Sequence, residues 1–129
     1  MTRIVFPLMI AALIGSATPA IADESYRGGL DAEGRLISVT LTLQPAKYPG
    51  DPAGQIRFGE PWACDFQLEL SGTRGQTSIY SFKGAGAGAC TSLTMGYLQS
   101  RPDDGGLQVE LFDKKNTSRQ KAWLRLVTD

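Results

Sequence analysis

Hydrophobic and polar residues alternate along most of the chain from residue 23 onward. From Ile37 to Leu43 every second residue is apolar and the residues between are serine or threonine, which is the period of a strand with one buried face. The same alternation runs through Phe66–Leu70, Leu93–Tyr97, Leu107–Leu111 and Ala122–Val127. Shorter strands are expected at Ser25–Leu30, Gln55–Phe58 and Ser78–Lys83. Because no window carries an apolar stripe at helical spacing over three turns, the pattern predicts an all-β domain of eight strands.

Clusters rich in glycine, proline and aspartate separate these strands, at residues 31–34, 45–54, 71–75 and 103–106. Such residues supply the backbone angles that chain reversals need, so we expect consecutive strands to pair in an antiparallel meander. A small eight-stranded barrel closes the two edges of such a sheet. Large inward side chains are expected to fill it, among them Phe66, Leu68, Tyr97 and Leu111. A two-sheet β-sandwich is the alternative, which alternation alone does not distinguish from a barrel.

The first 22 residues follow a different pattern. Arg3 precedes the apolar run Ile4–Ile14, and the small residues of Ala20-Ile21-Ala22 follow, which is the layout of a secretory signal peptide. Cleavage is expected after Ala22, with Ala20 as the alternative, leaving residues 23–129 as a single β domain. The apolar run is shorter than the roughly 20 residues of a membrane span, and no cysteine near the cut offers a site for a lipid. We therefore expect a periplasmic or secreted protein without a membrane anchor.

Cys64 and Cys90 are the two cysteines of the chain, and an even number in a small exported domain indicates a disulfide. If the strands that follow Cys64 form a hairpin, Cys64 lies roughly opposite Gly84, six residues before Cys90. The Gly-Ala hexapeptide between them must then loop back or bulge to bring the sulfur atoms within bonding range. This need accounts for Gly84, Gly86 and Gly88 without a bound phosphate, since a nucleotide-binding turn also requires a following helix.

Composition and charge exclude several classes of function. The 129 residues include 13 basic and 13 acidic side chains and no histidine, and zero net charge argues against a nucleic-acid-binding surface. The missing histidine excludes Ser-His-Asp and Cys-His mechanisms carried by this chain alone and removes the commonest metal ligand. We expect no catalytic residue, metal ion or cofactor. A local group of positive charges fits a solvated hairpin tip, or an acidic partner as the alternative: Lys114, Lys115, Arg119 and Lys121.

Two pairs of carboxylates are the remaining candidates for catalysis. Asp103 and Asp104 precede two glycines and fit a chain reversal. Glu60 and Asp65 flank a Pro-Trp pair with no sign of a cleft. A glycosidase needs two carboxyl groups facing one cleft, one of them with a raised pKa. A carboxylate-dependent hydrolase is therefore kept as an alternative, and it predicts that changing Asp103 or Asp104 to asparagine abolishes activity.

Other residues fit a binding surface. The stretch 44–54 contains three prolines that restrict its backbone, and Tyr48 at its centre is a large side chain with few torsions. Tyr48 either contacts a partner or packs back over an end of the barrel. Trp62, two residues before Cys64, either covers the disulfide or joins the binding surface. Lys83 and the glycines that follow it form a second candidate loop.

The two cysteines bracket a hairpin, from Ala63-Cys64-Asp65-Phe66-Gln67-Leu68 to Ala89-Cys90. Together with the size, the export signal and the eight strands, this layout resembles two groups of small exported bacterial proteins, the periplasmic lysozyme inhibitors and the barrel-shaped inhibitors of secreted metalloproteases. Lysozyme inhibitors carry Ser/Tyr and Lys-Gly motifs on adjacent loops. Tyr80-Ser81-Phe82-Lys83-Gly84 is similar to the second motif, and the first has no clear counterpart.

These observations favour a non-catalytic exported binding protein. We expect an inhibitor or immunity-type protein that blocks a cell-envelope or secreted hydrolase by inserting preformed loops into its cleft, as the resemblance implies. The alternative is a carrier whose barrel mouth holds a small apolar molecule or a glycan. A filled barrel interior would argue against the carrier.

Overall fold

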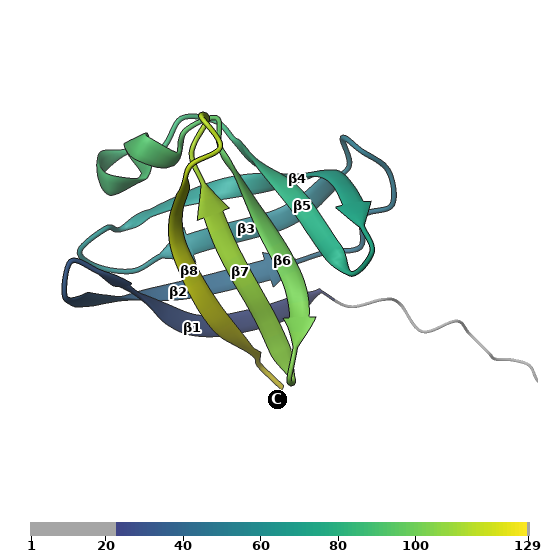
Figure 1. Ribbon diagram of the computed structural model, residues 1–129, viewed down its shortest axis with the longest axis horizontal. Helices are drawn as coiled ribbons and strands as arrows, with labels where there is room; N and C mark the ends of the chain where they lie inside the picture. The colour runs from purple at the N-terminus through teal and green to yellow at the C-terminus, as the bar shows by residue number, and fades with distance from the viewer. Residues whose placement is uncertain (1–22, 129) are drawn as a thin grey trace, which may run out of the picture.

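Eight antiparallel strands pair in chain order, and the last returns to the first to close a barrel (Figure 1). The strands are β1 (Glu24–Ala32), β2 (Arg35–Leu43), β3 (Pro52–Phe58), β4 (Cys64–Arg74), β5 (Thr77–Lys83), β6 (Tyr97–Asp103), β7 (Gly106–Phe112) and β8 (Ser118–Leu126), with a 3-10 helix η1 (Gly88–Leu93) between β5 and β6. The structure, a computed structural model, describes residues 23–128, and the predicted signal peptide at residues 1–22 lies outside them. The predicted all-β barrel is confirmed and the sandwich alternative is wrong.

Alternation along each strand builds the core. In β2 the inward side chains of Ile37, Val39 and Leu41 are at most 2% exposed, whereas Ser38 between them faces solvent. Inward residues of the other strands join them in one cluster of buried apolar side chains. The rings of Phe66 and Phe82 stack there with centroids 4.6 Å apart. The inward side chains therefore pack against one another, as expected for an eight-stranded barrel that is filled by its own residues.

One strand lies later in the chain than the alternation predicts. Leu93 is the last residue of η1 and Met95 lies in a turn, so the strand expected at Leu93–Tyr97 instead begins at Tyr97 as β6. The inward residues of β6 are Leu98 and Ser100, which are 0% and 4% exposed. The prediction that Tyr97 points inward is therefore wrong. Its ring stacks outside the barrel on the ring of Phe112, with centroids 4.8 Å apart.

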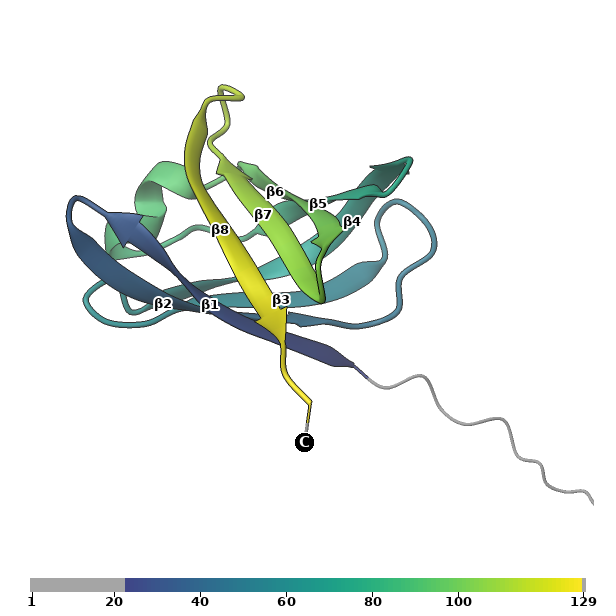
Figure 2. The same ribbon diagram turned by 60° about the horizontal axis from the view of Figure 1, so that its bottom comes forward.

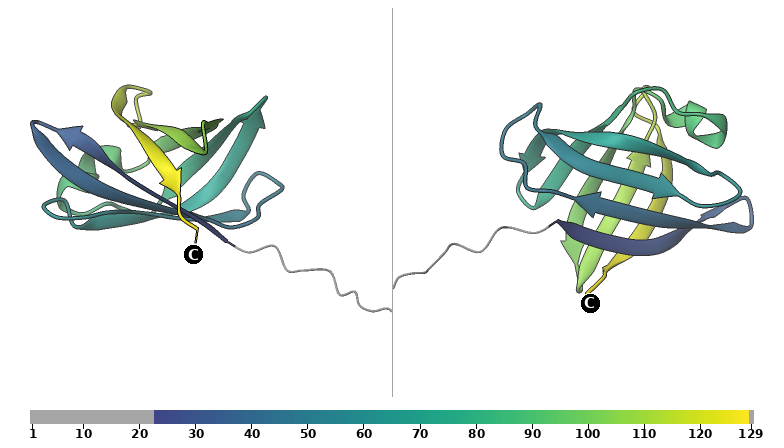
Figure 3. Two further views of the ribbon diagram at one scale, coloured as in Figure 1. Left: turned by 90° about the horizontal axis from the view of Figure 1, so that it is seen from below. Right: turned by 180° about the vertical axis from the view of Figure 1, so that it is seen from behind.

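The connections between strands gather at two opposite ends of the barrel. At one end lie the connections 33–34, 59–63, 84–96 and 113–117, and because this end carries the disulfide we call it the disulfide end. At the other lie the connections 44–51, 75–76 and 104–105, and we call it the Tyr48 end. Figures 1, 2 and 3 show η1 and the β2–β3 connection at opposite ends of the strands. The meander itself produces this separation, since successive connections alternate between ends.

Candidate functional site

The longest connection at the Tyr48 end is the segment 44–51, which we call the Tyr48 loop. The carboxylate of Asp51 accepts hydrogen bonds from the backbone N–H groups of Lys47 and Tyr48, each at 2.9 Å. These bonds hold the pKa of Asp51 below its ordinary value, the bond from Tyr48 having the larger effect, because they stabilise the charged form. One carboxylate therefore fixes the turn that carries Tyr48.

A second set of hydrogen bonds ties the Tyr48 loop to the barrel. The N–H of Gly50 donates to the carbonyl of Leu70 at 2.8 Å, and the N–H of Leu70 donates to the carbonyl of Asp51 at 2.9 Å. This exchange lies beside the bulge in β4 between Leu70 and Gly72. Tyr48 itself is 66% exposed. Of the two alternatives for this side chain, the structure therefore contradicts packing over the barrel end.

The disulfide between Cys64 and Cys90 fixes the other end of the barrel. It joins the first residue of β4 to η1, with the two Cα atoms 6.1 Å apart. Gly86 lies directly against Cys90, and a Cβ atom on it would meet the Cys90 carbonyl oxygen at 2.4 Å. Gly84 and Gly88 have positive φ angles of 84° and 54°. The predicted loop-back of this segment is confirmed, and its glycines serve the close approach and turns around the disulfide.

Trp62 and Lys83 also lie at the disulfide end, away from Tyr48. Trp62 is half-buried, and its indole packs on the ring of Phe58 with centroids 5.2 Å apart. Lys83 is the last residue of β5, and its ammonium lies 3.3 Å from the Glu69 carboxylate. The predicted binding residues thus divide into two groups, with Tyr48 at one end and Trp62, Lys83 and the three glycines at the other. A single flat surface does not join them.

Met95 marks an open groove beside Lys83. The groove has a volume of about 620 Å³, and Glu69, Lys83 and Tyr97 also line it. The N–H of Gly96 donates to the carbonyl of Leu93 at 2.8 Å, which closes a turn with Met95 at its third position. Met95 has φ 66° and is 74% exposed. That backbone conformation normally favours glycine, so Met95 combines a strained backbone with an exposed apolar side chain.

Three of the four acidic residues of the hydrolase alternative lie in backbone turns or sheet contacts of the barrel. Asp104 and Gly105 have φ angles of 50° and 81° and make the tight turn between β6 and β7. The backbone carbonyl of Asp103 accepts a hydrogen bond from the indole N–H of Trp123 at 2.9 Å. Asp65 accepts one from the Gln55 amide at 2.6 Å. Within residues 23–128 no group of three or more acidic or cysteine side chains is arranged to hold a metal ion.

The sequence alone did not reveal Asp51 or Met95 as site residues. A signal for Asp51 exists, since an aspartate directly after a turn-forming Tyr-Pro-Gly is able to accept backbone N–H groups at the start of that turn. Met95 offers no such signal, because its conformation depends on how η1 meets β6.

Comparison with known proteins identifies no relative of the chain. No family model matches it, no curated protein matches it, and no solved structure matches it. Within residues 23–128 no helix is long and apolar enough to cross a membrane. The disulfide is compatible with an exported protein. Function is therefore inferred from the geometry of the chain itself.

Proposed function

We propose that this chain is a non-catalytic binding protein that acts outside the cytoplasm, as an inhibitor that blocks a cell-envelope or secreted hydrolase. The observation that supports this most directly is the Tyr48 loop, in which an exposed tyrosine stands on a backbone fixed by the Asp51 carboxylate and by backbone hydrogen bonds to Leu70. A segment held in one conformation before binding loses little entropy when it binds. Tyrosine is also among the residues that most often dominate binding energy at interfaces.

The inhibition is steric. The Tyr48 loop enters the cleft of the hydrolase with the phenol ring leading, and the barrel behind it keeps substrate out. The prolines at 45, 49 and 52 restrict the backbone on both sides of the tyrosine. In contrast, the packed interior offers little support for a carrier that holds its ligand inside the barrel, since the inward side chains already contact one another.

Inhibition assays with purified enzymes test this proposal. The protein is added to a panel of cell-wall lytic enzymes and secreted metalloproteases, and inhibition constants are measured for any enzyme that slows. We expect at least one nanomolar inhibition constant, and a loss of about thirtyfold or more in Tyr48→Ala, because truncation of a hot-spot residue costs about 2 kcal/mol or more.

The matched control is Leu36→Ala. Leu36 is 78% exposed and lies next to the β1–β2 turn at the disulfide end, so its removal deletes a comparable exposed apolar side chain away from the Tyr48 loop. This variant is expected to inhibit like the unmodified protein. Equal inhibition by Tyr48→Ala and the unmodified protein would contradict the assignment of the loop, and the absence of any nanomolar target in the panel would count against an inhibitor.

A further inference from the structure

A pocket of about 590 Å³ lies at the disulfide end, far from the Tyr48 loop. Residues from the β1–β2 turn, the β3–β4 connection, η1 and the start of β8 line it. Its apolar lining includes Ile37 and Leu93, which are 0% and 1% exposed, and Trp62 contributes an indole whose other neighbour is Phe58. The pocket therefore combines a flat aromatic wall with a lining of mixed polar and apolar residues.

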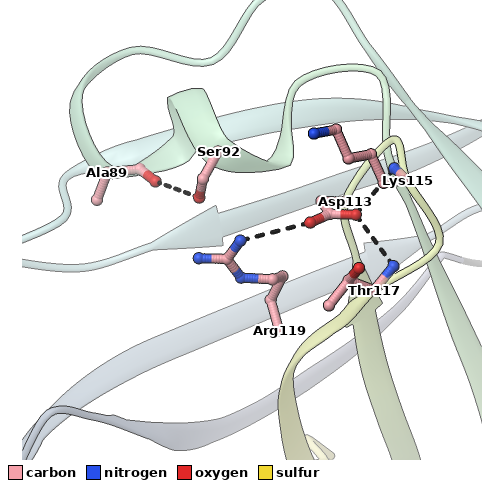
Figure 4. A network of polar contacts seen from close by, with 6 residues as sticks. All are labelled: Ala89, Ser92, Asp113, Lys115, Thr117 and Arg119. Carbon is pink, nitrogen blue, oxygen red and sulfur yellow. Dashed lines mark hydrogen bonds and ion pairs between the residues drawn. The ribbon is translucent and has the colours of Figure 1, made fainter.

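Arg119 supplies positive charge to this pocket, and Asp113 holds it in position. The Asp113 side chain is only 12% exposed, and one of its oxygens accepts the backbone N–H groups of Lys115 and Thr117 at 2.9 and 3.0 Å. Its other oxygen accepts from Nη1 of Arg119 at 3.4 Å. Figure 4 shows the guanidinium between Asp113 and η1, which carries Ala89 and Ser92. A carboxylate anchored by the hairpin thus sets the direction of the arginine.

The pocket retains donors for a ligand. A guanidinium has five N–H donors in a planar fork, and of the described residues only Asp113 accepts from that of Arg119. Arg35 brings a second guanidinium to the lining, and Glu33 brings one carboxylate. Asp113, which pairs with Arg119, balances this charge, so the group as a whole carries no net charge. A ligand is therefore recognised by the free N–H donors of the guanidinium groups and not by an excess of positive charge, which argues against a polyanion.

We propose that this pocket binds a monocarboxylate joined to a flat apolar group. The planar fork of Arg119 matches the two oxygens of a carboxylate, while Trp62 offers a face on which a flat group stacks. This site is independent of the Tyr48 loop and of the proposed inhibition.

A titration followed by nuclear magnetic resonance tests the proposal with 3-phenylpropionate as the probe and 3-phenylpropionamide as its uncharged control. The carboxylate is expected to shift the indole N–H signal of Trp62 in a saturable manner, with the amide binding about tenfold more weakly because it lacks the charge-assisted hydrogen bond. The chain has one other tryptophan, Trp123, whose indole N–H is bonded to Asp103 near the opposite end. Its signal is expected to stay in place.

Two variants assign the binding to Arg119. Arg119→Gln is expected to weaken binding of 3-phenylpropionate by about tenfold, because a hydrogen bond to a charged group is lost. Arg125→Gln, which removes another exposed arginine from the same strand, is expected to bind like the unmodified protein. Trp62→Ala is the second variant if Arg119→Gln does not fold, and it too is expected to weaken binding. Because it lacks the Trp62 indole, its titration is followed through the backbone amide signals of Ser92 and Gln120, which also line the pocket.

The proposal is overturned by any of several results. These are no saturable shift of the Trp62 signal, equal binding of acid and amide, or equal effects of Arg119→Gln and Arg125→Gln. Because none of these measurements involves a hydrolase, their failure leaves the proposed inhibitor function untouched, and failure of the inhibition assays leaves the pocket untouched.

Discussion

The two ends of the barrel fix their connections by different physical means. At the disulfide end a covalent bond ties η1 to the start of β4. At the Tyr48 end one carboxylate and one backbone exchange hold the loop. Backbone strain is also unequal, because five residues other than glycine have positive φ within residues 23–128. Four of these lie at the disulfide end (Glu33, Ala63, Met95 and Asn116), and only Asp104 lies at the other.

This difference follows from what each end must hold. The disulfide end carries the irregular segment 84–96, which makes few ladder hydrogen bonds and forms one side of a pocket. A long irregular segment loses much conformational entropy on folding, which a cross-link reduces by restricting the unfolded chain. The Tyr48 loop is shorter and lies against β4, so local hydrogen bonds suffice.

Loss of the disulfide is expected to have the largest effect. Cys64→Ser combined with Cys90→Ser removes a cross-link between residues 26 positions apart, which lowers the free energy of unfolding by about 3–4 kcal/mol in the chain-entropy picture. Urea denaturation measures this loss. Amide hydrogen exchange at low denaturant is expected to accelerate most in residues 84–96. In the Tyr48 loop it is expected to accelerate only as far as the lower free energy of unfolding of the whole domain requires. Faster exchange in the Tyr48 loop than in residues 84–96 would contradict the division into two ends.

Relief of strain at Met95 is expected to have the next largest effect. Met95→Gly places glycine at a positive φ of 66°, and it raises the free energy of unfolding by about 0.5–1 kcal/mol after the added flexibility of the unfolded chain is deducted. Urea denaturation again gives the value. Met95→Ala is the control, because alanine keeps the backbone strain and is expected to bring no stabilisation. Equal stabilisation by both variants would show that the exposed methionine side chain, and not the backbone conformation, destabilises the unmodified protein.

The position of β6 shows where sequence patterns fail. Alternation located β2 and β7 well because their inward residues are all apolar, as at Ile37, Val39 and Leu41. In β6 the inward residue Ser100 is polar and Pro102 lies within the strand, so the true strand does not alternate. Leu93 and Met95 belong instead to η1 and to the turn that follows it, so their apolar spacing does not mark a strand.

Acid is expected to release the Tyr48 loop through Asp51. Its pKa is lowered in the folded protein, so its stabilising effect is complete above the ordinary aspartate value of about 3.9 and is lost as pH falls through the folded value. In Asp51→Ala the amides of Lys47 and Tyr48 are expected to exchange roughly tenfold faster at neutral pH, since their acceptor is gone. The difference from the unmodified protein is expected to shrink at acidic pH. A difference that stays constant down to pH 2 would contradict the role of the ionised carboxylate.

Removal of the Tyr48 side chain is expected to have the smallest effect on stability. Because the ring is 66% exposed, Tyr48→Ala changes the free energy of unfolding by less than about 0.5 kcal/mol. Thermal or urea denaturation provides the measurement. A loss above about 1 kcal/mol would mean that the ring packs on the barrel in solution, which would remove the reason to regard it as a binding residue.

The candidate sites were predictable only in part. Tyr48 could be selected because three prolines surround it in a long connection, and this local signal survives in the structure. The pocket at the disulfide end could not, since Arg35, Trp62 and Arg119 come from three separate parts of the chain. Closure of the barrel brings them together, and the alternation that predicts a barrel does not show which residues meet at its ends.

The central claim is that the Tyr48 loop, and not the disulfide end, contacts the inhibited hydrolase. Amide hydrogen exchange of the protein alone and in complex with an enzyme that it inhibits tests this directly. The account predicts slower exchange in residues 44–51 on complex formation, with η1 and residues 113–117 unchanged. Protection confined to η1 and residues 113–117, with the Tyr48 loop exchanging as in the free protein, would contradict it.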